Sequence, residues 1–273
     1  GKSTLLGLIT RNCSADIVVT GLIGERGREV QEFVHETLGS EGLKRSVVVA
    51  SPSDSPAISR QYATFAATAI AEFYRNQGLD VLLLIDSLTR TARAIREVNL
   101  AAGELPVRQG YTPTVYAELP RLLERPGNTQ HGSITAIYTV LTTPDQKNDA
   151  LAEEVVSLLD GHVRLSEERA TKGLYPAVDP LTSLSRLAPR LLPTEVQAAV
   201  QCMRTAIHAL ETEKEIVQFG GEASPELKAA LSLETEINSF LVQEQSEQTT
   251  LTKTYNSLCS IAEKYKLHIN GQD

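Results

Sequence analysis

Residues 80–90 read DVLLLIDSLTR, and Val81–Ile85 within them is the longest uninterrupted aliphatic run of the chain. Five aliphatic residues without a polar interruption are typical of a strand that is buried on both faces, as in a parallel sheet covered by helices. A membrane helix needs about 20 apolar residues, so this run does not predict one. Asp86 follows at once. Ligands of open α/β sheets bind at the carboxyl ends of the strands, so this stretch predicts a fold class and one edge of a site.

The same pattern continues on both sides of this run, up to about residue 190. Short β-branched or aliphatic runs predict further strands at 17–23, 47–50, 134–141 and 162–165. Helix-like segments alternate with them at 28–38, 57–76, 91–100, 114–123 and 150–159. Because strands separated by helices form parallel sheets covered on both faces, we expect an α/β domain over residues 1–190.

The composition changes after Pro193, since only three of the 17 Gly and two of the 12 Pro lie beyond residue 190. Three helices are predicted there by apolar residues at helical spacing. The first is capped by Thr194 and ends at Gly220-Gly221, and the second starts with Ser224 and Pro225. The residues that we expect to be buried in the second and third helices are Leu227, Leu231, Ile237, Leu241, Leu251, Tyr255, Leu258, Ala262 and Tyr265. These stripes could also bind a partner, but mutual packing is the commoner use of such stripes, so we expect a small α-helical domain over residues 191–273.

Composition and charge exclude several classes of protein. The chain of 273 residues carries a formal charge of −8, which argues against a nucleic-acid groove lined by clustered Lys and Arg. The three cysteines, Cys13, Cys202 and Cys259, form no C-x-x-C pair, so we expect neither a disulfide framework nor a zinc site. A reducing compartment fits this cysteine content best. No H-E-x-x-H or G-x-S-x-G motif occurs.

The first residues, Gly1-Lys2-Ser3, match the end of the phosphate-binding motif G-x-x-x-x-G-K-[ST]. In that loop the backbone N–H groups wrap the phosphates, the Lys reaches the β and γ oxygens, and the hydroxyl binds Mg²⁺. A three-residue match is weak by itself. The helix-forming run at 5–9 strengthens it, because it would place a helix N-terminus at the anion. Neither an initiator Met nor a strand precedes the motif, so we expect the chain to begin inside the loop.

Two carboxylates are candidates for the chemistry. Asp86 could bind Mg²⁺ at the end of its strand, or it could cap the next helix, a role that Ser87 or Thr89 could also fill. Glu25, in the glycine-flanked segment GERG, could orient the water that attacks a γ-phosphate. The alternative for Glu25 is an exposed side chain paired with Arg26 or Arg28.

Two further side chains are weaker candidates, each a single residue of a common kind. Arg186 could be an arginine finger, which stabilises transition-state charge and often comes from a neighbouring subunit. Tyr175, whose turn is restricted by Pro176, could stack on an adenine. An ordinary surface arginine and an ordinary core or surface tyrosine are the alternatives.

Taken together, the chain resembles the catalytic ATPases of bacterial type III protein export, in flagella or injectisomes, which are similar to the catalytic β subunit of rotary ATP synthases. The segments that carry the resemblance are GKSTLL at 1–6, GLIGERGREVQEF at 21–33, DVLLLIDSLTR at 80–90, REVNLAAGELPVRQGYTPTVYAELPRLLERPG at 96–127, GSITAIYTVL at 132–141, DGHVRLS at 160–166 and LYPAVDPLTSLSR at 174–186. The resemblance implies a RecA-like P-loop NTPase core over 1–190, without its first strand and the start of its phosphate loop. It also implies that the family's N-terminal β-barrel is absent from this sequence.

The resemblance implies a role for each candidate. Gly1, Lys2, Ser3, Thr4 and Tyr175 would bind ATP, and Ser3 and Asp86 would bind Mg²⁺. The implied catalytic residues are Lys2, Glu25, Arg26, Arg90 and Arg186, with Arg186 donated across a subunit interface.

The resemblance also implies an assembly and a location. We expect a homohexamer at the cytoplasmic face of the inner membrane, peripheral to it through its partners. Those partners would be stator and central stalk proteins of the export apparatus, the export gate and chaperone–substrate complexes. Three alternatives to an export ATPase are a rotary ATP synthase subunit, a ring translocase on RNA, and an inactive fragment that serves only as an interaction module. The acidic charge disfavours the RNA translocase.

Overall fold

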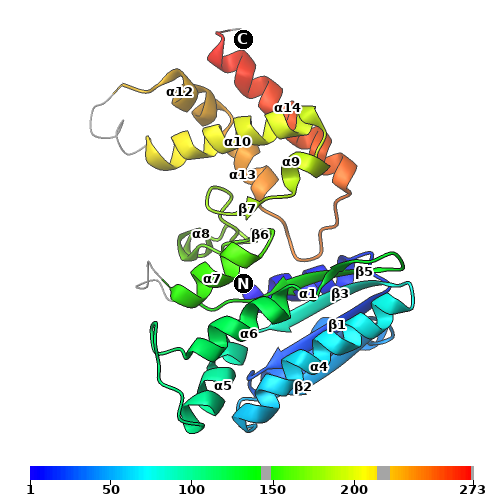
Figure 1. The fold of residues 1–273 in the computed structure, drawn as a ribbon. Helices are drawn as coiled ribbons and strands as arrows, with labels where there is room; N and C mark the ends of the chain where they lie inside the picture. The colour runs from blue at the N-terminus through cyan, green and yellow to red at the C-terminus, as the bar shows by residue number, and fades with distance from the viewer. Residues whose placement is uncertain (143–148, 214–221, 272–273) are drawn as a thin grey trace. The chain divides into compact units, whose positions relative to one another are not determined.

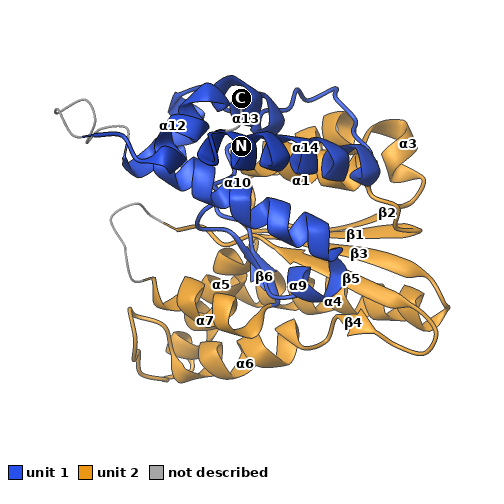
Figure 2. Ribbon diagram, turned by 90° about the horizontal axis from the view of Figure 1, so that it is seen from above, with its two compact units in different colours: residues 1, 160–273 blue, residues 2–159 orange. Residues whose placement is uncertain are grey.

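The computed structural model describes residues 1–142, 149–213 and 222–271. The chain divides into two compact units, one of residues 2–159 and one of residue 1 with residues 160–273, which have different colours in Figure 2. The predicted domain boundary at residue 190 stays a prediction, because these units reflect contacts and not function.

A five-stranded sheet lies at the centre of residues 2–159 (Figure 1). Its order is β2 (Ser46–Ser51), β1 (Ile17–Ile23), β3 (Asp80–Asp86), β5 (Ser133–Tyr138) and β4 (Gly127–Asn128). The first four strands are parallel, and β4 runs antiparallel to β5. The register places Leu22 beside Asp86 and Ile85 beside Tyr138, so β1, β3 and β5 end at the same edge. The predicted α/β fold with a parallel sheet is confirmed.

Helices cover both faces of this sheet, with α1 on one side and α4 on the other (Figure 2). Alternate residues of the central strands supply the two cores, because side chains alternate between faces. Leu82 and Leu84 pack with Leu6 of α1, whereas Leu83 packs with Ala67 of α4. The helices of this unit are α1 (Lys2–Asn12), α2 (Gly27–Glu32), the π-helix η1 (Phe33–Leu38), α3 (Gly39–Leu43), α4 (Ala57–Asn76), α5 (Leu88–Ala101), α6 (Pro113–Leu123) and α7 (Ala150–Leu158).

The other unit begins with a two-stranded antiparallel pair, β6 (Gly161–His162) and β7 (Leu184–Ser185). Its helices are α8 (Glu167–Thr171), α9 (Ala188–Leu191), α10 (Thr194–Thr212), α12 (Pro225–Ser232), α13 (Glu234–Leu241) and α14 (Leu251–Ile269). Side chains of α10, α12, α13 and α14 share one core, which contains Met203, Ala230, Ile237 and Tyr265. The predicted mutual packing of the tail helices is therefore confirmed.

Details of the tail differ from the sequence-based expectation. Ser224 caps α12 by accepting from Leu227 N, as predicted, but the second helix breaks at Leu233 into α12 and α13. Leu231, expected in the core, is 38% exposed. Leu251, also expected there, is the first residue of α14 and is 65% exposed. The predicted helix end at Gly220-Gly221 lies outside the described residues. Nowhere in the described part of the chain is a helix both long and apolar enough to cross a membrane.

Candidate functional site

The N-terminus of α1 lies at the carboxyl edge of the sheet, because Lys2, its first residue, reaches the side chains that follow β1 and β3. Lys2 Nζ donates to Asp86 Oδ1 and lies 3.6 Å from Glu25 Oε1. The first turn of α1 contains no acidic residue, so nothing there offsets the positive end of the helix dipole. Unpaired N–H groups and a lysine at one helix end form a site suited to an anion.

Glu25 follows β1 across Gly24 and is buried, with 5% of the residue exposed. Arg90 of α5 holds its carboxylate with both ends of the guanidinium: Nε donates to Oε1 at 3.1 Å, and Nη2 donates to Oε2 at 3.4 Å. The alternative of an exposed Glu25 paired with Arg26 or Arg28 is therefore wrong, and Arg26 pairs with Glu29 at 3.4 Å.

Gly24 makes the approach of Arg90 possible. Its φ is +68°, in the left-handed region that favours glycine. A Cβ at this position would lie 2.8 Å from Arg90 Cδ and 3.2 Å from Arg90 Cβ. The arginine stem thus crosses the space that a side chain at residue 24 would fill, on its way to Glu25.

Asp86 ends β3 and is 5% exposed. It does not cap α5, because Ser87 is the N-cap and its Oγ accepts from Arg90 N. Thr139, directly after β5, donates its hydroxyl to Asp86 Oδ1 at 2.7 Å. The Asp86 carboxylate is thus held from one side by Lys2 and from the neighbouring strand by Thr139.

The environment of Glu25 shifts its titration. Burial raises the pKa of this carboxyl above the ordinary 4.5, and a hydrogen bond with the Glu29 side chain acts in the same direction. Lys2 and Arg90 lower the pKa, but by less than burial raises it. A carboxylate with a raised pKa accepts a proton or a hydrogen bond from water more readily than an ordinary surface glutamate.

The structure brings together four of the residues predicted for the site, namely Lys2, Glu25, Asp86 and Arg90. Gly1, Ser3 and Thr4 are exposed beside Lys2. Arg26 is exposed next to Glu25, and the last two predicted residues, Tyr175 and Arg186, belong to the other compact unit. There Tyr175 is 48% exposed and precedes the cis peptide bond to Pro176, and Arg186 is exposed at the end of β7, with its N–H donating to Asp160 O at 2.7 Å.

The donor set fits Mg²⁺ that is bound together with a nucleotide. In the described ranges, no group of three or more His, Cys, Asp or Glu side chains is arranged to hold a metal ion. Proteins usually bind Mg²⁺ through one or two carboxylates, waters and substrate phosphates, and not through an all-protein cage. One buried carboxylate, Asp86, and one exposed hydroxyl, Ser3, at an anion-binding helix end meet that requirement.

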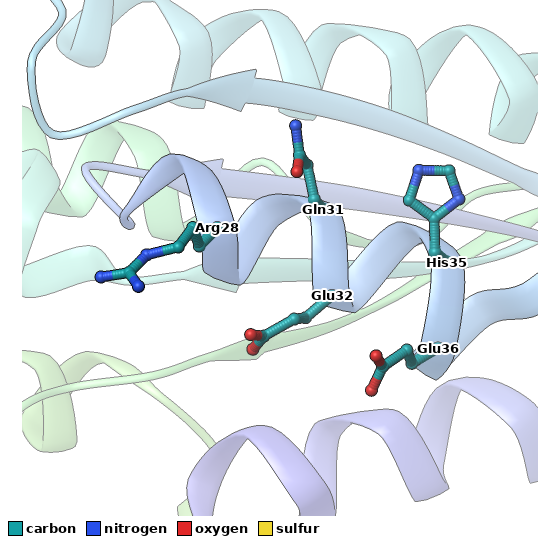
Figure 3. Close-up of a pocket in the computed structure, with 5 residues that line it drawn as sticks. All are labelled: Arg28, Gln31, Glu32, His35 and Glu36. Carbon is teal, nitrogen blue, oxygen red and sulfur yellow. The ribbon is translucent and has the colours of Figure 1, made fainter.

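A separate pocket of about 270 Å³ lies on α2 and η1. Its lining residues are Arg28, Gln31, Glu32, His35 and Glu36 (Figure 3). Gln31 and His35 extend to one side of the helix, and Glu32 and Glu36 to another. None of the residues predicted for the site lines this pocket, and its mixed charges indicate no single class of ligand.

Sequence reasoning missed one contributor to the site, Thr139. Thr139 follows β5, which neighbours β3, so a polar residue at that strand end lies near Asp86 once the strand order is known. Gly24 belongs to the glycine-flanked segment predicted around Glu25, and its part in making room for the Arg90 side chain is visible only in the structure.

Comparisons with known proteins identify the family of the chain. Residues 1–185 match the nucleotide-binding domain of the ATP synthase alpha/beta family. A flagellum-specific ATP synthase of Treponema pallidum is 46% identical over 94% of this chain and 58% of its own length. The chain spans 58% to 61% of the length of the curated relatives that it matches.

Solved structures show the same similarity. A prototypical ATPase from the type III secretion system of pathogenic bacteria superposes with a TM-score of 0.89 at 43% identity, over 96% of this chain and 76% of that chain. The assembled ATPase EscN of enteropathogenic E. coli, in complex with its central stalk EscO, gives 0.89 at 42% identity, over 96% and 64%. This chain therefore belongs to the ATP synthase alpha/beta family and, within it, to the group of flagellar and type III secretion ATPases.

Proposed function

We propose that this chain is the catalytic part of a magnesium-dependent ATPase that energises type III protein export, in flagellar assembly or virulence secretion. The observation that carries the proposal is the convergence of Lys2, Glu25, Asp86 and Arg90 at one sheet edge beside a helix N-terminus. Identities of 43% to 46% with flagellar and secretion ATPases favour export over ATP synthesis, since an ATP synthase subunit of Nanoarcheaum equitans is 25% identical.

In this proposal the start of α1 binds the phosphates of ATP. Backbone N–H groups of Ser3 and Thr4, with Gly1 before them, donate to phosphate oxygens. Lys2 exchanges its present carboxylate partners for the β and γ oxygens, which carry more negative charge. Ser3 and Asp86 would hold Mg²⁺, which neutralises charge on the phosphates.

Glu25 orients the attacking water. Arg90 fixes both carboxylate oxygens, so the side chain keeps one direction, and burial excludes bulk water from it. The proton-accepting form is the carboxylate, which the raised pKa makes a better acceptor. Arg26, beside Glu25, would lie near the γ-phosphate after leaving its present partner Glu29.

The remaining roles require a ring. The assembly of EscN supports a homohexamer, and its complex with EscO supports a central stalk partner. Arg186 of one protomer would then stabilise transition-state charge in the site of its neighbour, and Tyr175 would stack on the adenine. We extend the proposal to stator proteins, the export gate and chaperone–substrate complexes as partners, and to the cytoplasmic face of the inner membrane as the place of action.

The test is a pair of substitutions in the complete protein. Glu25→Gln keeps the shape and removes the charge, so we expect ATP turnover to fall by about 100-fold or more while nucleotide binding is kept. Glu41→Gln removes the same charge from an exposed side chain that pairs with Lys44 and contacts none of the site residues described here, so it serves as the matched control. Wild-type turnover in the Glu25→Gln protein would refute the assignment.

A second experiment tests the shared site. Protomers with Arg186→Ala lack the donated arginine, and protomers with Lys2→Ala lack phosphate binding. In a mixed ring, an intact Lys2 site can face an intact Arg186, so the mixture should hydrolyse ATP faster than either variant alone. A mixture no more active than its components counts against an inter-subunit site.

A further inference from the structure

The segment before Arg186 is tightly braced within its own unit. Asp179 Oδ1 accepts from Leu181 N at 2.8 Å and from Thr182 N at 3.1 Å, which closes a local turn. Ser183 Oγ donates to Asp179 O at 2.6 Å and accepts from Arg164 N at 3.0 Å. Residues 179–183 are thus held in one conformation directly before β7 and Arg186.

A side chain from the helical tail completes this brace. Arg204 of α10 donates from Nη1 to Pro180 O and, at 3.4 Å, to Ser183 O, and from Nη2 to Leu181 O at 2.6 Å. Leu181 also packs against the apolar core formed by α10, α12, α13 and α14. A planar guanidinium with several fixed donors is suited to binding three carbonyls at once, whereas a lysine ammonium is not pre-organised for this.

Arg186 lies only three residues beyond the last of these carbonyls. The backbone N–H of Arg186 donates to Asp160 O, and β7, directly before Arg186, pairs with β6. The backbone position of Arg186 therefore depends on this short strand pair and on residues 180–183. Three residues span about 10 Å of chain at most, so a shift of Ser183 is transmitted to Arg186 with little slack.

We propose that Arg204 is a positioning residue, which sets the place of Arg186 and so lets the helical tail govern how well one protomer completes its neighbour's ATP site. This inference rests on the proposed function, because it needs Arg186 to act in trans. Arg204 touches neither substrate nor phosphate in this role. It acts through the carbonyls of residues 180–183.

Substitutions at Arg204 in the complete protein test the role. Arg204→Gln should lower kcat by about 10- to 100-fold, as expected when a catalytic group is misplaced by about 1 Å, with the KM for ATP nearly unchanged. Arg204→Lys keeps the charge but has a single donor nitrogen, so it should recover part of the loss. Arg190→Gln removes an equal charge from the exposed end of α9 and should have no effect. A fall in kcat of less than twofold for Arg204→Gln would overturn the proposal.

The brace itself is measured without nucleotide. Amide hydrogen exchange should accelerate at Leu181 and Thr182 in the Arg204→Gln protein, while the amides of α14 keep their wild-type protection. General acceleration throughout the helical tail would mean that Arg204 only stabilises the fold, which would overturn the positioning role. If Arg204→Gln does not form rings, the same comparison is made with Arg204→Lys.

Mixed rings separate this inference from the proposed function. Arg204→Gln protomers mixed with Lys2→Ala protomers should regain activity, because an intact Lys2 site then faces a well-placed Arg186. Recovery in the Arg186→Ala mixture but not in the Arg204→Gln mixture overturns the inference alone. No recovery in either mixture overturns both the role of Arg186 in trans and the positioning of it by Arg204.

Discussion

Replacing Gly24 by alanine should weaken the protein and its site by two separable effects. The first is backbone strain, because residue 24 has φ +68°, which L side chains adopt at a cost. The second is steric, because the new Cβ would lie 2.8 Å from Arg90 Cδ. The arginine must then move away from the glutamate that it holds.

Each effect has a magnitude. The left-handed backbone costs about 1–2 kcal/mol for a residue with a Cβ. Displacing Arg90 loosens its hydrogen bonds to Glu25 at 3.1 and 3.4 Å, and charged hydrogen bonds contribute about 1.5–3 kcal/mol. Arg90 is 31% exposed, so the lower end applies to it, and the expected total loss in the free energy of unfolding is about 3 kcal/mol.

The assay is denaturant unfolding followed by circular dichroism, with the free energy extrapolated to water. Gly27→Ala is the matched control, since Gly27 has neither a positive φ nor an atom within 4 Å of its new Cβ. At such a site the substitution should be neutral, or stabilising by about 0.4–1 kcal/mol.

A double-mutant comparison decides between the two effects. In an Arg90→Ala background the 2.8 Å clash with Cδ and the hydrogen bonds to Glu25 are both gone, and only the 3.2 Å approach to Cβ remains, so Gly24→Ala should cost close to the backbone strain of about 1–2 kcal/mol there. An equal cost in both backgrounds would show that the arginine stem does not need the space above Gly24. A loss below about 0.5 kcal/mol in the wild-type background, the range of neutral surface substitutions, would refute both parts of the reasoning.

Three further predictions follow from burial and charge. Leu227→Ala, at a fully buried side chain, should cost about 2–5 kcal/mol, and Leu231→Ala, at a side chain 38% exposed in the same helix, less than about 1 kcal/mol. Equal losses in denaturant unfolding would contradict the different burial of these two leucines. Glu72→Gln should cost about 1–2 kcal/mol at pH 7. Because hydrogen bonding to Arg125 lowers the pKa of Glu72, the stabilisation is complete above pH 4.5 and is lost as the pH falls through the lower folded value, so unfolding curves of the two proteins should converge in acid. Because burial raises the pKa of Glu25, ATP turnover of the complete protein should fall on the acid side at a pH above 4.5, and a pH–rate profile flat down to pH 4.5 would exclude this carboxylate as the acceptor.

The carboxylates could be predicted from the sequence because each follows an apolar run. A parallel sheet brings the ends of neighbouring strands to one edge, so Glu25 and Asp86 had to lie close together once both runs were strands of one sheet. Helix α4 was predicted with its observed bounds, since its apolar residues keep helical spacing over 20 residues.

Other features carry no local signal. Thr139 reaches Asp86 only through the pairing of β5 with β3, which is a tertiary fact. No glycine or proline marks the break between α12 and α13 at Leu233. The residue is instead buried in the core that α10, α12, α13 and α14 share, which is a tertiary feature. The π-helix η1 likewise follows α2 without a sequence marker.

The central strand β3 is apolar on both faces, which leaves its alignment weakly defined by hydrophobicity. A slip by one residue would exchange the side chains facing α1 with those facing α4, and both sets are aliphatic and buried. Polar groups resist such a slip at both ends of the strand: Asp80 accepts from Ser133 Oγ at 2.6 Å, and Asp86 accepts from Thr139. Asp86, which we propose as a magnesium ligand, thus also helps to fix the alignment of β3. Replacing it with an apolar residue of equal size would remove this restraint, so it would promote misaligned sheets in addition to loss of activity.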